Sequence, residues 1–239
     1  MGLDAEGDLA IRDLWSRLEQ LRVPSLQGHV PSIRPQLSLT VTDVADGQRQ
    51  HAPGLALRGV ETDIEMAAVA LALEMGLDPE ADRAIRELWS QLERLGVPSL
   101  QGHVPSIRPH LSLTVTDDAD GLRQHAPGLA LRGVETDIEM GAVALFSADP
   151  PVLVLTVAPA PELVALHARV SAALAAAEVD VWPHYRPGTW LPHCTLSMGV
   201  PTEVVAHALA ACLASPLPVR ARLRAAALTD SVTGATTPL

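Results

Sequence analysis

The chain contains no lysine, so all 17 of its basic residues are arginine, against 28 acidic residues. This absence excludes sites built on a lysine amine: the phosphate-binding lysine of a P-loop, a Schiff base and a lysyl-nucleotide intermediate. The net charge of −11 also argues against tracking along a long nucleic acid, because such binding draws on many cationic contacts. A small phosphorylated ligand is compatible with this charge.

Cysteines and long apolar runs are scarce as well. Cys194 and Cys212 are too few and too far apart for a zinc site or a disulfide framework, which suits a reducing compartment. The N-terminal "MGLDAEGD" has no apolar core of signal-peptide length, and the apolar runs are too short to span a bilayer. We therefore expect a cytoplasmic protein that does not associate with a membrane.

The sequence does contain an internal repeat. Residues 1–71 align without gaps on residues 75–145, with about four positions in five identical. No third copy follows, so we interpret the repeat as a partial duplication. The second copy keeps the stronger helix signals, because Asp78 and Pro79 suit the start of a helix and Gly96 suits its end.

The rest of the chain alternates short apolar runs with helical patterns at 161–177 and 202–214. The predicted strands cover residues 67–74, 110–115, 129–135, 141–147, 152–157, 193–198 and 219–228. We expect the last ten residues to fray. This mixture favours an α+β fold, with residues 66–239 as the main domain and residues 1–65 as a degenerate copy of its first helix and strand.

Two motifs share the pattern Pro-His-x-Ser/Thr-Leu, and each follows a predicted helix by about 15 residues. Because side chains alternate along a strand, His110 and Ser112 are expected to share one face. His193 and Thr195 do the same in the second motif. The match predicts two lobes related by a pseudo-two-fold axis, with both imidazoles facing a common cleft.

A pair of opposed imidazoles suits acid–base chemistry near neutral pH, since one accepts a proton while the other donates one. The neighbouring hydroxyls can donate hydrogen bonds to phosphate oxygens. Two imidazoles with two neighbouring hydroxyls suit the attack of a hydroxyl on a cyclic phosphodiester, a reaction that needs no metal. Gln36 occupies the position of His110 in the first copy, and its amide cannot exchange a proton near pH 7, so the active lobe uses His110.

Residues 66–239 resemble the 2H phosphoesterases, which include the bacterial enzymes called 2′-5′ RNA ligases or RNA 2′,3′-cyclic phosphodiesterases. Both His-x-Ser/Thr motifs and the stretch "HYRPGTWLPHCTLS" carry the resemblance. It implies a bilobed fold, His110 and His193 as catalytic residues, and action on 2′,3′-cyclic phosphate or 2′-5′-linked RNA ends without metal or cofactor. The chain departs from the "TLAR" pattern of many RNA-ligase members, because it reads "TLSM" there.

Other residues have two interpretations each. Arg186 is a candidate phosphate contact and Tyr185 a candidate base or sugar contact, and both are otherwise surface loop residues. Trp190 either stacks on a base or anchors the core. Three arginines on one predicted strand face form either a basic rim or the solvated face of an edge strand: Arg220, Arg222 and Arg224.

Three questions stay open from the sequence. The motifs do not assign which histidine is the base. A cleft that holds a nucleotide or RNA end without turnover, or one that acts on another small cyclic phosphodiester, would use the same residues. The duplicated segment either packs as an appendage or exchanges between chains into the position of residues 75–139, which would make an oligomer.

Overall fold

The computed structural model describes residues 70–239, and the predicted domain at 1–65 lies outside the described residues. The elements follow one another as β1 (Leu71–Leu77), α3 (Pro79–Arg94), α4 (Leu100–His103), β2 (His110–Thr116), α5 (Ala119–His125), η1 (Ala126–Leu129), β3 (Thr136–Phe146), β4 (Val152–Val157), α6 (Pro161–Ala176), η2 (Pro183–Tyr185), β5 (His193–Ser197), η3 (Thr202–Val204), α7 (Val205–Leu213), β6 (Val219–Asp230) and β7 (Thr236–Pro238). The α+β class is confirmed.

Helix α3 forms where the local signals place it. The Asp78 side chain accepts hydrogen bonds from the backbone N–H groups of Glu80 and Ala81, and Pro79 fills the first helical position. The helix ends before Gly96, whose φ of 77° lies in the left-handed region that glycine tolerates without strain. These boundaries matter because α3 carries a tryptophan, Trp89, that reaches the second motif.

The strands pair into one antiparallel sheet in the order β2-β1-β6-β3-β4-β5, with β7 paired to β6. This order reads alike from both ends: a motif strand lies at each edge, its antiparallel partner β1 or β4 lies beside it, and β6 and β3 pair in the middle. The two halves predicted as lobes are therefore joined in one continuous sheet through the β3–β6 pair.

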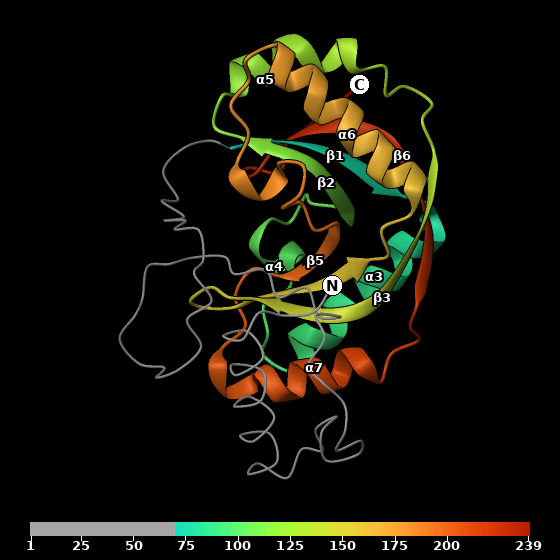
Figure 1. Cartoon of the computed structure of the whole chain (residues 1–239). Helices are drawn as coiled ribbons and strands as arrows, with labels where there is room; N and C mark the ends of the chain where they lie inside the picture. Colours follow the sequence, from blue (N-terminus) through green and yellow to red (C-terminus); the bar gives the residue numbers. More distant parts are fainter. Residues whose placement is uncertain (1–69) are drawn as a thin grey trace, which may run out of the picture. The chain divides into compact units, whose positions relative to one another are not determined.

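The long helix that links the two strands of each outer pair contacts the other half of the sheet. Helix α3 links β1 to β2 yet contacts β5, and α6 links β4 to β5 yet contacts β2. Figure 1 shows α5 and α6 at the end of the domain that carries β1 and β2, and α3 and α7 at the end that carries β5. The edge strands β2 and β5 contact each other directly, so the sheet curves until its two edges meet.

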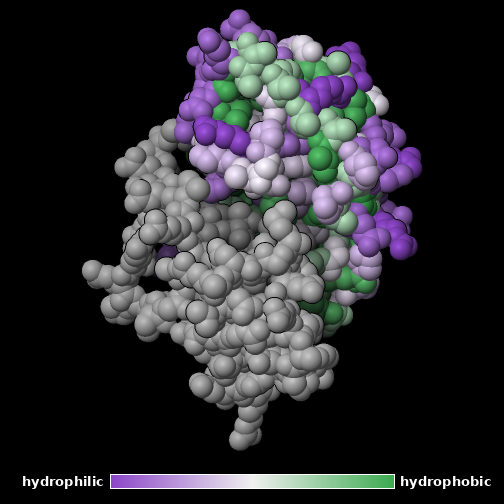
Figure 2. Space-filling view, viewed as in Figure 1, coloured by the Kyte–Doolittle hydropathy of each residue, from purple (hydrophilic) through white to green (hydrophobic). Residues whose placement is uncertain are grey.

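One large hydrophobic core runs through both halves and includes side chains that are at most 1% exposed, such as Trp89, Leu111 and Leu155. Over the surface drawn in Figure 2, hydrophobic residues are interspersed with hydrophilic ones, including around α5 and α6. Val164 on α6 is among the exposed large hydrophobic residues. None of the helices within residues 70–239 is both long and apolar enough to cross a membrane.

Three predictions of local structure were wrong. Residues 129–135 are not a strand, because Ala130 (φ 52°) and Gly133 (φ 72°) turn the chain before β3 begins at Thr136. Strand β6 is not an edge strand, since it pairs with β1 and β3. The last ten residues do not simply fray, because β7 pairs with β6.

Candidate active site

The two motifs lie at the start of the two edge strands, β2 and β5, and their side chains alternate between partly exposed and buried as predicted. In β2, His110 and Ser112 keep partly exposed side chains while Leu111 is buried. In β5, His193 and Thr195 are likewise partly exposed on either side of a buried cysteine. Each motif thus presents one imidazole and one hydroxyl on one face of its strand. The side chains on the opposite face pack into the core.

Both imidazoles are held by the same local contact. Nδ1 of His110 lies 2.7 Å from the carbonyl oxygen of Arg108, and Nδ1 of His193 lies 2.7 Å from the carbonyl oxygen of Leu191. A carbonyl oxygen only accepts hydrogen bonds, so Nδ1 carries a proton in each ring. The contact fixes the orientation of each ring and leaves Nε2 as the nitrogen available for chemistry.

Contacts between the edge strands bring the motifs together. The backbone of His110 lies within hydrogen-bonding reach of the Cys194 thiol. The Trp89 indole N–H donates to the carbonyl oxygen of Thr195, and the Trp190 indole N–H donates to that of Ser112, each at 3.2 Å. An indole from one half of the chain thus holds the motif strand of the other half.

Burial determines the protonation state of His193. Burial, and secondarily the nearby His110, lower the pKa of His193 to about 4, although the carbonyl of Leu191 favours the protonated ring. The ring of Phe146 also lies edge-on against His193, with centroids 4.8 Å apart. His193 is therefore neutral at pH 7, with a lone pair on Nε2.

His110 differs because a carboxylate faces it. Nε2 of His110 lies 3.1 Å from Oε1 of Glu74, and the two side chains are only 14% and 10% exposed. Glu74 lies on β1, where it pairs in register with Ser112. No residue of the described part of the chain makes an equivalent ion pair with His193.

Tyr185 lies in the same neighbourhood. Burial raises the pKa of Tyr185 to about 12, and the negative charge of Glu74 adds to the shift, while a hydrogen bond with Ser112 opposes it. The phenol therefore stays protonated at all working pH values. Tyr185 thus lies beside the predicted residue Ser112, on the strand that also carries His110. The contact of Tyr185 with substrate stays a prediction.

The remaining candidates are held in other contacts. The guanidinium of Arg186 pairs with Asp180 at 3.0 Å and also donates to the carbonyl of Val181. The Trp190 ring stacks on His167 at 3.9 Å and packs against the core, which fits its interpretation as a core anchor. The phosphate contact predicted for Arg186 would require it to leave or share the Asp180 pair.

Comparison with known families decides the relationship. The model of the family described as the 2′-5′ RNA ligase superfamily matches residues 77–235. The chain belongs to this superfamily. A search of curated proteins finds no match.

Solved structures align over 72% of this chain and 95% of their own length. They include LigT of E. coli complexed with NADP+ (14% identity, TM-score 0.47) and in apo form (16%, 0.47). A structure described as a phosphoesterase is 15% identical with a TM-score of 0.43.

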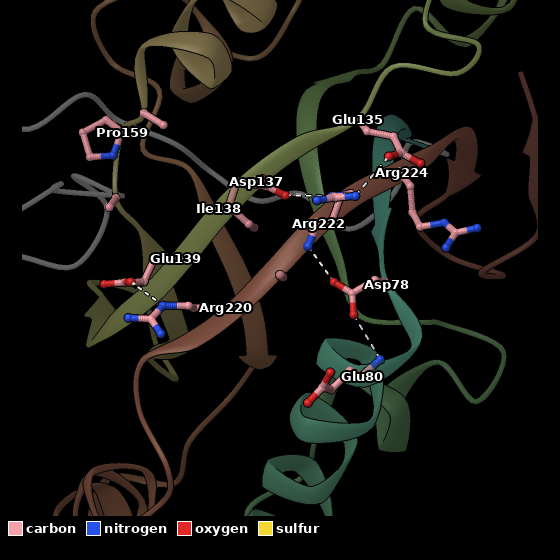
Figure 3. A pocket seen from close by; sticks show the side chains of 13 residues that line it. Asp78, Glu80, Glu135, Asp137, Ile138, Glu139, Pro159, Arg220, Arg222 and Arg224 are labelled. Carbon is pink, nitrogen blue, oxygen red and sulfur yellow. Dashed lines mark hydrogen bonds and ion pairs between the residues drawn. The ribbon is translucent and has the colours of Figure 1, made fainter.

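A separate groove of about 840 Å³ runs along β3 and β6, away from the histidine pair. Its arginines are largely neutralised, because Arg220 pairs with Glu139 and Arg222 pairs with Asp137, as Figure 3 shows. Arg224 also lines the groove. The structure therefore favours a solvated face of paired arginines over a free basic rim. The strand that carries them is nevertheless central rather than an edge strand.

Two residues beside the histidines were not predicted from the sequence. Glu74 was assigned to a strand but not to the site, although a single carboxylate within the apolar run Leu71–Leu77 was a detectable signal. Phe146 gave no signal, because its contact with His193 joins strands that are not neighbours in the sheet. Within residues 70–239, no group of three or more His, Cys, Asp or Glu side chains is arranged to hold a metal ion.

Proposed function

We propose that the protein is a phosphoesterase that acts on 2′,3′-cyclic phosphate or 2′-5′-linked RNA ends by two-histidine acid–base catalysis, without a metal. The observation that carries the proposal is the matched geometry of His110 and His193. Each Nδ1 is fixed on the carbonyl two residues earlier, and each Nε2 is left for proton transfer.

The reaction requires proton transfer on both sides of the phosphorus atom. As water attacks a cyclic phosphate, one imidazole takes its proton, and as the ribose oxygen leaves, the other imidazole protonates it. The hydroxyls of Ser112 and Thr195 share the imidazole faces and would donate hydrogen bonds to the nonbridging phosphate oxygens. Reversal of the same steps joins a cyclic phosphate to a hydroxyl without ATP.

The substrate is a small nucleotide or an RNA end rather than a long polyanion. The net charge of −11 disfavours extended phosphate contacts, and Arg186, Arg220 and Arg222 are already paired with carboxylates. A single phosphate between two imidazoles does not need a basic track. Tyr185 lies beside Ser112 and is the candidate contact for a base or sugar.

The test is turnover of nucleoside 2′,3′-cyclic phosphates and of 2′-5′-linked dinucleotides with EDTA present. We expect His110→Ala and His193→Ala each to lower kcat by about 10²–10⁴-fold. His207→Ala is the matched control, since this histidine is exposed on α7, and it should retain activity.

Three results separate the alternatives. Nucleotide binding without turnover by the wild type would favour a non-catalytic binding module. Turnover that survives both histidine substitutions would refute the two-histidine chemistry, and turnover that disappears with EDTA would refute metal independence. A panel with 3′-5′ linkages and non-nucleotide cyclic phosphodiesters then defines the substrate.

A further inference from the structure

The two histidines differ in what faces their Nε2 atoms. Nε2 of His110 lies 3.1 Å from the carboxylate of Glu74, and both side chains are largely buried. Within residues 70–239, no hydrogen bond or ion pair engages Nε2 of His193, whose ring is instead flanked by Phe146. The two halves of the sheet match in strand order, but the site built on them is asymmetric.

The hydrogen-bond partners of the two rings imply that His110 and His193 differ in protonation. Nδ1 of each ring must carry a proton, because it faces a carbonyl oxygen. A contact between Nε2 of His110 and a carboxylate oxygen is attractive only with a second proton between them. The Glu74–His110 pair therefore holds one transferable proton, whereas Nε2 of His193 offers a lone pair.

We propose that Glu74 is a positioning residue that keeps this proton on His110, so that His110 is the general acid and His193 the general base when a cyclic phosphodiester is hydrolysed. The inference rests on the proposed function, and its new element is Glu74, the group that holds the proton on Nε2 of His110. Glu74 itself need not touch the substrate.

The other groups around the pair support this distribution of charge. The Tyr185 phenol on η2 and the Cys194 thiol on β5 both have pKa values raised to about 12, chiefly by burial, so neither carries charge at pH 7. Asp82 on α3 acts on Cys194 only at longer range. Glu74 is thus the nearest anion to His110, and a positive His110 in turn helps to keep His193 neutral.

The step balances in protons and bonds. Water forms a new bond to phosphorus and gives a proton to Nε2 of His193. The bond from phosphorus to one ribose oxygen breaks, and that oxygen receives the proton held by Nε2 of His110, for which it competes with Glu74. Afterwards His193 releases its proton to solvent, and the Glu74–His110 pair takes one up, which restores the starting state.

Glu74→Gln tests the proposal, because the amide keeps the size of the side chain and removes its charge. In the pH profile of kcat/KM for a nucleoside 2′,3′-cyclic phosphate, we expect the basic limb to move to lower pH. Activity at pH 8 should fall by about tenfold or more, while the acidic limb stays in place. Glu80→Gln, on the exposed first turn of α3, is the matched control and should leave both limbs unchanged. Glu74→Asp should recover part of the loss.

Histidine NMR on the full-length wild type gives a readout that does not depend on the variant folding. At pH 7 we expect the ¹⁵N shifts of a doubly protonated ring for His110 and of a neutral ring protonated at Nδ1 for His193. A neutral His110 without a proton shared with Glu74, or a doubly protonated His193, would overturn the assignment.

A leaving-group experiment separates failure of this inference from failure of the proposed function. An aryl phosphodiester releases a phenolate that needs little protonation, so His110→Ala should lose much less activity on it than on the cyclic phosphate. His193→Ala should lose activity on both. The reverse pattern would exchange the two roles and overturn the inference alone, whereas absence of wild-type turnover on both the cyclic phosphate and the 2′-5′-linked dinucleotide would refute the proposed function.

Discussion

The lowered pKa of His193 predicts how the stability of the protein depends on pH. In an unfolded chain a histidine titrates near 6.5, whereas burial and His110 bring the pKa of His193 to about 4 in the folded protein. Between these values the unfolded state binds more protons than the folded state. The contribution of His193 to stability is therefore complete above pH 6.5 and is lost as the pH falls toward 4.

The magnitude follows from the two pKa values. A shift of 6.5 to about 4 corresponds to about 3 kcal/mol over the full window, at 1.36 kcal/mol for each pKa unit. Between pH 7.5 and 5.5, which stays above the sequence pI of about 5.2, the same linkage gives about 1.4 kcal/mol. With a urea m-value of about 1–3 kcal/mol/M, this is a shift of about 0.5–1.4 M in the unfolding midpoint.

The assay is urea unfolding at both pH values for the wild type and His193→Asn, whose amide can still donate to the carbonyl of Leu191. The variant should lose about 1.4 kcal/mol less stability than the wild type on acidification. The contribution of buried His167, whose pKa is also lowered by burial, is present in both proteins and cancels. His207→Asn serves as the surface control. Equal losses in wild type and His193→Asn would refute the reasoning.

Three further predictions follow from burial and from the repeat. Leu111→Ala should destabilise the protein by about 2–5 kcal/mol in urea unfolding, because Leu111 is fully buried. Leu213→Ala, at a 68% exposed position, should change the free energy of unfolding by about 0.5 kcal/mol or less. Similar losses in the two variants would contradict this prediction. Cys194 and Cys212 have pKa values raised by burial to about 12 and 11, so a thiol reagent at pH 8 should label them only after denaturation. Deletion of residues 1–65 should preserve folding and turnover, and a folded but inactive product would oppose the predicted domain boundary.

Local signals predicted what depends on neighbours in the chain. Asp78, Pro79 and Gly96 gave the boundaries of α3 because capping and left-handed backbone are properties of single positions. The period-two alternation gave the exposed face of His110 and of His193 because a strand permits no other arrangement. The chemistry inferred for the motifs depended on the same local patterns.

The sequence did not reveal features that depend on which strands are neighbours. The arginines of β6 alternate as they would on an edge strand, yet β1 and β3 cover both of its sides. Glu74 lies 36 positions before His110 in the chain and meets it only because β1 pairs with β2 in a particular register, with a bulge beside Glu74. No local pattern specifies such a register.

The crossing of α3 and α6 to the opposite halves of the sheet has a consequence for how the candidate site is assembled. The bond from Trp89 to Thr195 spans 106 positions and that from Trp190 to Ser112 spans 78. Closing loops of this length is slow relative to forming a helix or a hairpin. Each motif strand gains its indole contact only when both halves of the chain have docked, so the proposed activity depends on the whole domain rather than on either half.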